Sequence, residues 1–386
     1  MVNKCIVHLV NLRDFGGVEQ LVLSYILDNN KYNNIIINTS NSLNKKLNKY
    51  SNEIIFCNRI IQNHEIQYPS FIRKKILWDR IKRIDPSHVI IWNQVISLNG
   101  KPDSIKAIYY DHGASWELEK NKKTIDFFKK IDGCICVSNA SKKMIENSFK
   151  HNCDISVLLN KAKHNTQGKD SKNHHKNTKF TIGCAARFSP IKALGLIPLI
   201  AEETKKRGFD FKFIIAGSGE EESSLINLIK NKKLENDVLL AGFINDLDDF
   251  YNDLDIYIST SAHETCSLAC IEAMSFGLPI ISANIDGQPE IISNNSTGFC
   301  ISPTMTMDEY CIKTEMAYPF NGKIYYPEHN SINTPLLLSP SDAADKIIKL
   351  YIDGTDNYKK NAINRAKTLF NADNFEEDLA KIIRNF

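Results

Sequence analysis

The chain has 386 residues, of which 42% are apolar, so it is long enough to form two domains of ordinary size. No apolar run approaches the ~18 residues that cross a bilayer and no charged-then-apolar leader opens the chain, so we expect a cytoplasmic protein or one lying on a membrane. The net charge is +3, but residues 1–172 carry 27 Lys and Arg against 16 Asp and Glu. Because no nucleic-acid motif accompanies these charges, they favour an anionic membrane surface or a lipid-pyrophosphate acceptor.

The first half alternates short apolar runs with longer helical patterns, which is typical of a parallel sheet covered by helices. The runs predict strands at Cys5–Val10, Ile35–Ile37, Ile54–Phe56, Val89–Trp92, Ala107–Tyr109, Cys134–Val137 and Ser156–Leu159. Gly16 and Gly17 follow the first run and open a helix. Paired glycines let a ligand approach the backbone closely, but a strand-to-helix turn also favours glycine, so both interpretations stay open.

The segment Phe71–Ile84 has an apolar stripe flanked by six Lys and Arg residues. It is either an amphipathic helix in an anionic membrane interface or a basic surface helix whose stripe packs on the sheet. Further along, His112 follows a predicted strand, at the edge where parallel sheets bind ligands. Ser138 follows the next strand and is expected to cap a helix.

Residues 164–179 contain no large apolar side chain and therefore predict a linker between domains 1–163 and 180–386. The second domain opens with a strand that leads to Arg187, and Lys192 follows five residues later, across a turn with Pro190. Two cations at this spacing can neutralise a diphosphate and the charge that develops when it leaves.

Acidic residues and cysteines do not predict a metal site. Glu220, Glu221 and Glu222 are expected in the first turn of a helix, where they complement its dipole. Two D-x-D pairs resemble metal motifs, but the apolar spacing within 247–254 predicts an amphipathic helix with an acidic outer face. The ten cysteines form no C-x-x-C pair and no Cys/His set at zinc spacing, which favours reduced, packed thiols.

The segment Asp255–Gly298 joins a short strand, a polar loop and a helix expected over Ser267–Phe276. Such a loop directs the backbone N–H groups of a helix N-terminus at whatever lies above the sheet, where an anion would bind. Glu264 lies in the loop and Glu272 in the helix, and carboxylates beside an anion site accept hydrogen bonds from hydroxyls. A diphosphate with two polyols describes a nucleotide sugar.

These residues resemble the retaining GT-B glycosyltransferases of family four. The stretch E-T-C-S-L-A-C-I-E-A-M-S-F-G-L-P-I-I-S, followed by Gly287, Pro289-Glu290 and Thr297-Gly298, is similar to that family's pair of glutamates separated by seven residues. The similarity extends from Gly183 to Pro303 and more loosely over the first domain. It implies an α/β GT-B fold with two Rossmann-like domains facing across a cleft.

The resemblance also implies roles for particular residues. Arg187 and Lys192 correspond to the cations that stabilise the departing diphosphate, and His112 to a histidine beside the reacting bond. Glu264, the fourth expected catalytic residue, would hold the hydroxyls of the donor sugar. The residues expected to bind the donor are Gly16, Gly17, Phe243, Thr265, Cys266, Ser267 and Glu272. Within this set Glu272 would contact the ribose, Phe243 the nucleobase pocket, and the glycines the donor phosphates and the acceptor.

The implied reaction moves a sugar, with retention of configuration, from a UDP-sugar or GDP-sugar to a hydroxyl of a glycan or lipid-linked acceptor. No metal or other cofactor is expected. The usual roles of this family favour a function in bacterial surface polysaccharide synthesis at the inner face of the cytoplasmic membrane. Alternatives on the same scaffold are a nucleotide-sugar epimerase, a phosphorylase, or a non-catalytic subunit that binds sugar nucleotides.

Two features depart from the family pattern. Ala193 stands where the family's lysine is commonly followed by glycine. Residues 304–338 form an insertion without an interpretable motif, which could shape acceptor choice, contact a partner or only decorate the rim. After it, Ser339 is expected to cap a helix, and residues 375–386 to form a terminal helix that crosses back to the first domain.

Overall fold

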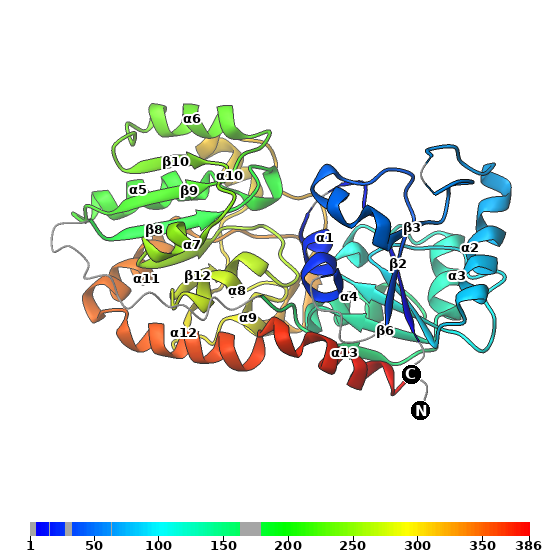
Figure 1. The fold of residues 1–386 in the computed structure, drawn as a ribbon. Coiled ribbons are helices and arrows are strands. Elements are labelled where there is room, and N and C mark those ends of the chain that lie inside the picture. The colour runs from blue at the N-terminus through cyan, green and yellow to red at the C-terminus, as the bar shows by residue number, and fades with distance from the viewer. Residues whose placement is uncertain (1–4, 15, 28–32, 63, 163–178) are drawn as a thin grey trace. The chain divides into compact units, whose positions relative to one another are not determined.

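A computed structural model describes residues 5–14, 16–27, 33–62, 64–162 and 179–386. It divides into two compact units, unit 1 (Met1–Leu159 with Ala372–Phe386) and unit 2 (Asn160–Asn371), each organised around a parallel sheet (Figure 1). Apart from Lys179, the segment expected to be a linker lies outside the described residues. No described helix combines the length and the apolar character that a membrane span requires.

Unit 1 contains, among its described residues, a sheet of seven parallel strands in the order β3-β2-β1-β4-β5-β6-β7. The seven strands expected from the apolar runs are all present, and no end is shifted by more than two residues. They are β1 (Ile6–Val10), β2 (Asn34–Asn38), β3 (Ile54–Phe56), β4 (His88–Trp92), β5 (Lys106–Asp111), β6 (Gly133–Cys136) and β7 (Ile155–Val157). The succession of strands reverses between β1 and β4, which makes the sheet doubly wound.

The helices of unit 1 bury apolar stripes against this sheet. They are α1 (Gly17–Val22), α2 (Ser70–Ile84), α3 (Lys122–Lys130), α4 (Asn139–Ser148) and α13 (Phe375–Ile383), with shorter turns η1 (Leu23–Leu27), η2 (Lys45–Glu53), η3 (Ala114–Trp116) and η6 (Ala372–Asn374). Ser138 caps α4, since its Oγ accepts a hydrogen bond from the Ser141 N–H at 3.1 Å. Leu77 and Ile81 of α2 lie in the core, so the stripe of this helix packs on the sheet and is not available to a membrane.

The end of the chain belongs to unit 1. Phe375 of α13 stacks on Tyr25 with ring centroids 3.7 Å apart, and the Asn34 amide donates to the Glu376 carboxylate at 3.1 Å. The last residue, Phe386, lies against Gly133 of β6, where a Cβ atom would come within 2.5 Å of its ring. Gly133 therefore leaves the space that this terminal aromatic ring fills.

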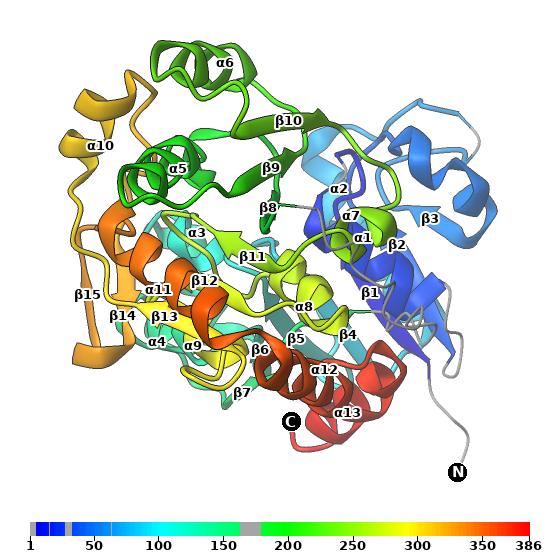
Figure 2. The same ribbon diagram turned by 90° about the vertical axis from the view of Figure 1, so that its left-hand side faces the viewer.

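Unit 2 repeats the same strand order. Its described residues form a six-stranded parallel sheet, β10-β9-β8-β11-β12-β13, with the reversal between β8 and β11. The strands are β8 (Thr181–Ala185), β9 (Lys212–Ala216), β10 (Val238–Gly242), β11 (Ile256–Ser259), β12 (Ile280–Ala283) and β13 (Gly298–Ile301). The covering helices are α5 (Leu196–Lys206), α6 (Glu222–Asn231), α7 (Asp248–Asn252), α8 (Leu268–Ser275), α9 (Gln288–Ile291), α11 (Pro340–Asp353) and α12 (Asp356–Leu369). Helix α11 packs beside α5 and α12 beside α8 (Figure 2).

The insertion is part of the core of unit 2. It contains α10 (Met307–Thr314) and a hairpin of β14 (Ile324–Tyr326) and β15 (Ser331–Asn333) joined by η5 (Pro327–His329), which Figure 2 shows along one side of this unit. Its apolar side chains are buried in the same core as the central sheet, among them Met307, Tyr310, Met316, Ile324 and Leu337. A segment buried to this degree is more than a decoration of the rim.

The acidic run before α6 differs from the expectation. The helix begins at Glu222, and Glu221 is buried with 4% exposure. The reason is a tight turn, since Gly217 and Gly219 have positive φ and the Glu221 N–H donates to the Phe188 carbonyl at 3.1 Å. Burial, with a contribution from the Glu220 charge, raises the pKa of Glu221 to about 7 from its ordinary 4.5.

Glu221 should make the stability of the protein depend on pH. Because its pKa is higher in the folded chain, the free energy of unfolding should fall as pH rises from about 4.5 to about 7. Glu221→Gln should remove this fall and stabilise the protein at pH 8 by on the order of 3 kcal/mol, since its pKa rises from 4.5 to about 7 and each tenfold change in proton affinity is worth about 1.4 kcal/mol. Thermal denaturation at pH 5 and pH 8 measures this, with Glu222→Gln as the control, and equal pH profiles for the Glu221 variant and the parent would contradict it.

Candidate functional site

The loops after β8 and β11 lie next to each other at the reversal of strand order in unit 2. These two strands are hydrogen-bonded neighbours, with Ile182 opposite Ile256. Arg187 and Lys192 follow β8, and Glu264 follows β11. Doubly wound sheets bind ligands outside the carboxyl ends of their strands at this position, so three of the expected residues lie on the two loops that would line such a site.

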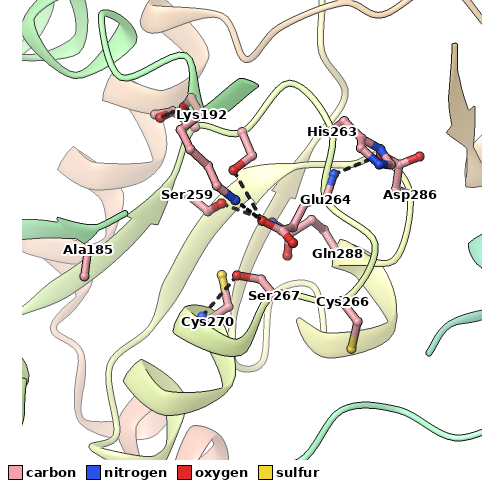
Figure 3. A network of polar contacts seen from close by, with 12 residues as sticks. Ala185, Lys192, Ser259, His263, Glu264, Cys266, Ser267, Cys270, Asp286 and Gln288 are labelled. Atoms are coloured by element: carbon pink, nitrogen blue, oxygen red, sulfur yellow. Dashed lines mark hydrogen bonds and ion pairs between the residues drawn. The ribbon is translucent and has the colours of Figure 1, made fainter. Parts of the chain in front are cut away.

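Lys192 and Glu264 are in direct contact. The Lys192 ammonium lies 2.7 Å from Oε2 of Glu264, and the two side chains are 27% and 15% exposed (Figure 3). Burial lowers the pKa of Lys192, but the charge of Glu264 and its hydrogen bond outweigh this effect, and the pKa is raised overall. Lys192 therefore carries its positive charge throughout the physiological range.

The backbones of the two loops hold this pair in place. The Thr260 hydroxyl donates to the Lys192 carbonyl at 2.8 Å, and the Ala262 N–H donates to the Ile191 carbonyl at 2.8 Å. Lys192 ends the 3-10 turn η4 (Pro190–Lys192), and the next residue, Ala193, has a φ of 46° and is fully buried. A left-handed conformation costs an L-residue about 1–2 kcal/mol, which explains why glycine is favoured at this position. Ala193 adopts the same conformation at that cost.

Arg187 extends from a rigid stretch of backbone. The Phe188 N–H donates to the Ser218 carbonyl at 2.9 Å, and a Cβ atom on Gly219 would meet the backbone of Phe188 at 2.3 Å. The Arg187 side chain itself is exposed, and within the described part of the chain no ion pair engages it. It thus offers a charge on the same loop as Lys192.

Glu272 has a different environment from Glu264. It lies in α8 and accepts a hydrogen bond from the Tyr251 hydroxyl at 3.1 Å. Burial raises the pKa of Glu272, the Tyr251 hydrogen bond lowers it, and the nearby Asp248 raises it further. The structure therefore brings Glu264 to Lys192 and gives Glu272 a tyrosine partner.

The short loop before α8 is fixed by its own side chains. Cys266 is buried, and its carbonyl accepts a hydrogen bond from the Asn160 amide at 2.9 Å. Ser267 caps α8, because its Oγ accepts from the Cys270 N–H at 3.3 Å. Because the Cys266 side chain is buried and the Ser267 hydroxyl caps α8, contacts from these two residues to a ligand would come from their backbone. Phe243, also expected in the donor site, is 60% exposed at the end of β10.

His112 lies in unit 1, directly after β5. Its ring is parallel to that of Trp92, with ring centroids 5.1 Å apart, and its backbone N–H donates to Oδ1 of Asn93 at 2.9 Å. Burial lowers the pKa of His112 to about 3. The imidazole is therefore neutral at physiological pH, and it suits hydrogen bonding to a hydroxyl better than charge stabilisation.

Gly16 and Gly17 are exposed at the turn between β1 and α1. The Gly16 N–H donates to the Glu19 carboxylate at 2.8 Å. Gly16 does not have a positive φ, and a Cβ atom there would make only an ordinary contact, 3.4 Å from Glu19. Among the described residues of unit 1, none requires a glycine at position 16.

A second polar contact, which was not expected from the sequence, lies beside Glu264. His263 Nδ1 and Asp286 Oδ2 are 2.8 Å apart, and the Glu264 N–H donates to the same oxygen at 3.1 Å (Figure 3). The available sequence signal was the Asp286-Gly287 pair after a strand, which indicates a turn but not its partners. Across the described residues, no three His, Cys, Asp or Glu side chains are grouped as metal ligands, and all ten cysteines are free thiols.

The sequence of unit 2 matches a known family over much of its length. Residues 166–312 match the family described as Glycosyl transferases group 1. Over 192 residues, 50% of this chain, the sequence is 30% identical to poly(ribitol-phosphate) alpha-N-acetylglucosaminyltransferase of Staphylococcus aureus strain COL. The aligned part of the chain spans only 37% of that enzyme's length.

Two solved structures share the fold over the whole chain. A glycosyltransferase from Rickettsia africae ESF-5 has a TM-score of 0.72 at 19% identity, covering 100% of this chain and 99% of its own. Anabaena Alr3699/HepE, in complex with UDP and glucose, has a TM-score of 0.71 at 16% identity, with coverages of 99% and 100%. At these identities the likeness shows the fold, and the α/β class with two Rossmann-like GT-B domains is confirmed.

The Lys192–Glu264 contact should be visible as an interaction energy in the free protein. We expect Lys192→Met and Glu264→Gln each to lower the free energy of unfolding by about 1–2 kcal/mol, because each leaves a largely buried partner unpaired. The double variant should lose clearly less than the sum of the two single losses. Urea denaturation of the four proteins measures this, and strictly additive losses would show that the two side chains do not interact.

Proposed function

We propose that this chain, which carries a glycosyl transferases group 1 domain over residues 166–312, is a retaining glycosyltransferase. It would move a sugar from a nucleotide-sugar donor to a hydroxyl of a glycan or lipid-linked acceptor. The observation that carries the proposal is the Lys192–Glu264 contact at the reversal of strand order in unit 2. This contact puts a cation for a diphosphate and a carboxylate for sugar hydroxyls side by side.

The cationic side of the site suits the leaving group. In the proposed reaction the bond between the anomeric carbon and the diphosphate oxygen breaks, and its electron pair stays on the diphosphate. Lys192 and Arg187 would stabilise that charge without needing a metal ion. The acceptor oxygen bonds to the anomeric carbon from the same face, and its proton passes to the leaving diphosphate, so no nucleophile from the protein takes part.

The carboxylate side suits the sugar. Oε2 of Glu264 contacts Lys192 at 2.7 Å and the Ser261 hydroxyl at 3.5 Å. Oε1 makes no hydrogen bond with any residue that the structure describes, so it remains able to accept one from a donor hydroxyl. The backbone of Thr265, Cys266 and Ser267 would approach the diphosphate at the N-terminus of α8.

The other expected residues of each unit have proposed roles of their own. Glu272, already hydrogen-bonded to a hydroxyl, would accept from the ribose, and the exposed ring of Phe243 would lie beside the base. In unit 1, the neutral His112 would contact the donor sugar. Gly16 and Gly17 would let phosphate or acceptor approach the backbone, which fits the absence of a conformational need for glycine at position 16.

The substrate classes are proposed from the similar proteins. Alr3699/HepE, whose structure contains UDP and glucose, supports a UDP-sugar as the donor. The similarity to a poly(ribitol-phosphate) glycosyltransferase supports an acceptor in a bacterial surface polymer. Work on such acceptors would place the protein in the cytoplasm, at the inner face of the membrane.

The proposal is tested by donor binding and by sugar transfer. A sugar nucleotide at ~100 times its dissociation constant should raise the free energy of unfolding by about 2.7 kcal/mol, which a thermal shift panel of UDP- and GDP-sugars detects. Glu264→Ala should lower kcat/KM for the winning donor at least 100-fold, and Arg187→Ala at least tenfold, while the surface control Lys206→Ala should have no effect. Release of a changed sugar nucleotide without any acceptor would indicate an epimerase, and partner binding without turnover would indicate a non-catalytic subunit.

We also propose that unit 1 rests on an anionic membrane surface through a patch beside α2. The large apolar side chains of Ile60, Ile61, Ile66 and Phe71 are 45%, 54%, 60% and 83% exposed. The Ile60 N–H donates to the Ile66 carbonyl at 2.9 Å, and the Arg73 guanidinium donates to the Tyr68 carbonyl at 2.7 Å, which ties this loop to the start of α2. Exposed lysine and arginine side chains follow on the helix: Lys74, Lys75, Lys82 and Arg83.

Vesicle binding tests this patch. The double variant Ile61→Ser/Phe71→Ser should bind vesicles containing phosphatidylglycerol at least tenfold more weakly, because apolar insertion adds to the attraction between the basic residues and the lipid. Ile312→Ser, which changes an isoleucine 79% exposed in unit 2, serves as the matched control. If the parent protein binds neutral and anionic vesicles equally, or the double variant binds as the parent does, the patch is not a membrane surface.

A further inference from the structure

Asp286 occupies a position that is costly for an aspartate. It lies between β12 and α9 and is fully buried, and its φ of 45° is in the left-handed region that favours glycine. A buried carboxylate loses its hydration unless it is hydrogen-bonded, and a left-handed backbone adds strain. Both costs are offset only by what the carboxylate contacts.

One oxygen of Asp286 holds the loop that carries Glu264. Oδ2 lies 2.8 Å from His263 Nδ1 and accepts the Glu264 N–H at 3.1 Å. The next residue reinforces the contact, since the Gly287 N–H donates to the Glu264 carbonyl at 3.3 Å. The peptide groups on both sides of the Glu264 Cα atom are therefore fixed from the 286–287 turn.

The other oxygen of Asp286 holds the insertion. Oδ1 accepts the Tyr325 N–H at 2.9 Å, and the Asp286 N–H donates to the Tyr325 carbonyl at 2.8 Å. Phe320, also in the insertion, stacks on the His263 ring with centroids 5.0 Å apart and planes 10° apart. The insertion thus reaches the Glu264 loop by two routes, through Asp286 and through His263.

A third contact fixes the hairpin to the sheet. Oε1 of Glu328, at the tip of the hairpin, accepts hydrogen bonds from the Asn284 amide at 2.8 Å and the Ser302 hydroxyl at 2.6 Å. Asn284 follows β12 and Ser302 follows β13, so both lie at the carboxyl-terminal edge of the sheet, as Asp286 does. The hairpin is therefore anchored independently of the Glu264 loop, which allows it to act as a fixed support.

We propose that residues 304–338 position the Glu264 carboxylate, with Asp286 as the positioning residue that transmits their support. The inference rests on the proposed function, in which Glu264 holds the hydroxyls of the donor sugar. A carboxylate that selects hydroxyls must be held within about 0.5 Å of its productive place by the residues around it. Here that support comes from the segment that interrupts the family pattern.

Hydrogen exchange tests the support without reference to activity. Asp286→Ala and Phe320→Ala should each speed exchange at the amides of residues 262–265 at least tenfold, since both remove a contact to that loop. Ile312→Ala, which changes a side chain that is 79% exposed in the same insertion, is the control and should exchange as the parent does. If Asp286→Ala fails to fold, Phe320→Ala still decides the question. Unchanged exchange at the Glu264 amide in a folded variant overturns the proposal.

Ligand affinity separates positioning from general damage. Asp286→Ala should weaken binding of the preferred sugar nucleotide at least tenfold yet leave binding of the free nucleoside diphosphate within twofold. The reason is that only the sugar nucleotide carries the donor sugar, whose hydroxyls Glu264 would hold. In a protein that already carries Glu264→Ala, adding Asp286→Ala should not weaken the binding of the sugar nucleotide further. Equal losses for both ligands, or additive losses in the double variant, overturn the positioning role. If no sugar nucleotide binds the parent, the proposed function fails, while the exchange result still stands by itself.

Discussion

The ion pair between Lys192 and Glu264 is the interaction on which the candidate site depends. Two opposite charges in a largely buried position need each other, because either one alone would have to be desolvated without compensation. Lys192 and Glu264 are about seventy residues apart in the sequence. They meet because β8 and β11, which precede their two loops, are adjacent in the sheet. Hydrogen bonds from Thr260 and Ala262 then fix the two loops together. A bound diphosphate would share the Lys192 ammonium with Glu264, so ligand binding would change the balance of this pair.

The same region shows why unit 2 tolerates two residues with a locally unfavourable backbone conformation. Ala193 and Asp286 both have left-handed backbones, and both adjoin residues of the proposed site. Local strain of this kind persists only where surrounding contacts determine the conformation. Around Asp286 those contacts come from the Glu264 loop and from the insertion, which is itself packed into the core. The insertion is therefore a structural part of the unit and is placed to influence its chemistry.

Burial also sets the charges of two groups that do not belong to the ion pair. His112, between aromatic rings, is neutral because desolvation disfavours the imidazolium ion. Burial likewise raises the pKa of Glu221, so this side chain keeps its proton at a higher pH than an exposed glutamate does. Glu221 is buried because the turn at Gly217 and Gly219 places it before the start of α6. In both cases the sequence shows a titratable residue at a strand or helix end, where solvent exposure would be expected. The tight packing around it decides otherwise.

The sequence by itself determined the α/β class, the seven strands of unit 1, the capping roles of Ser138 and Ser339 and the loops that carry Arg187, Lys192 and Glu264. These features follow from local periodicity and from turn residues, which act over a few positions. Only the tertiary structure decided that the α2 stripe packs inward, that Glu221 is buried, and that Asp286 joins the insertion to Glu264. Those outcomes depend on contacts between residues far apart in the chain, and the side chains themselves give no local sign of their partners.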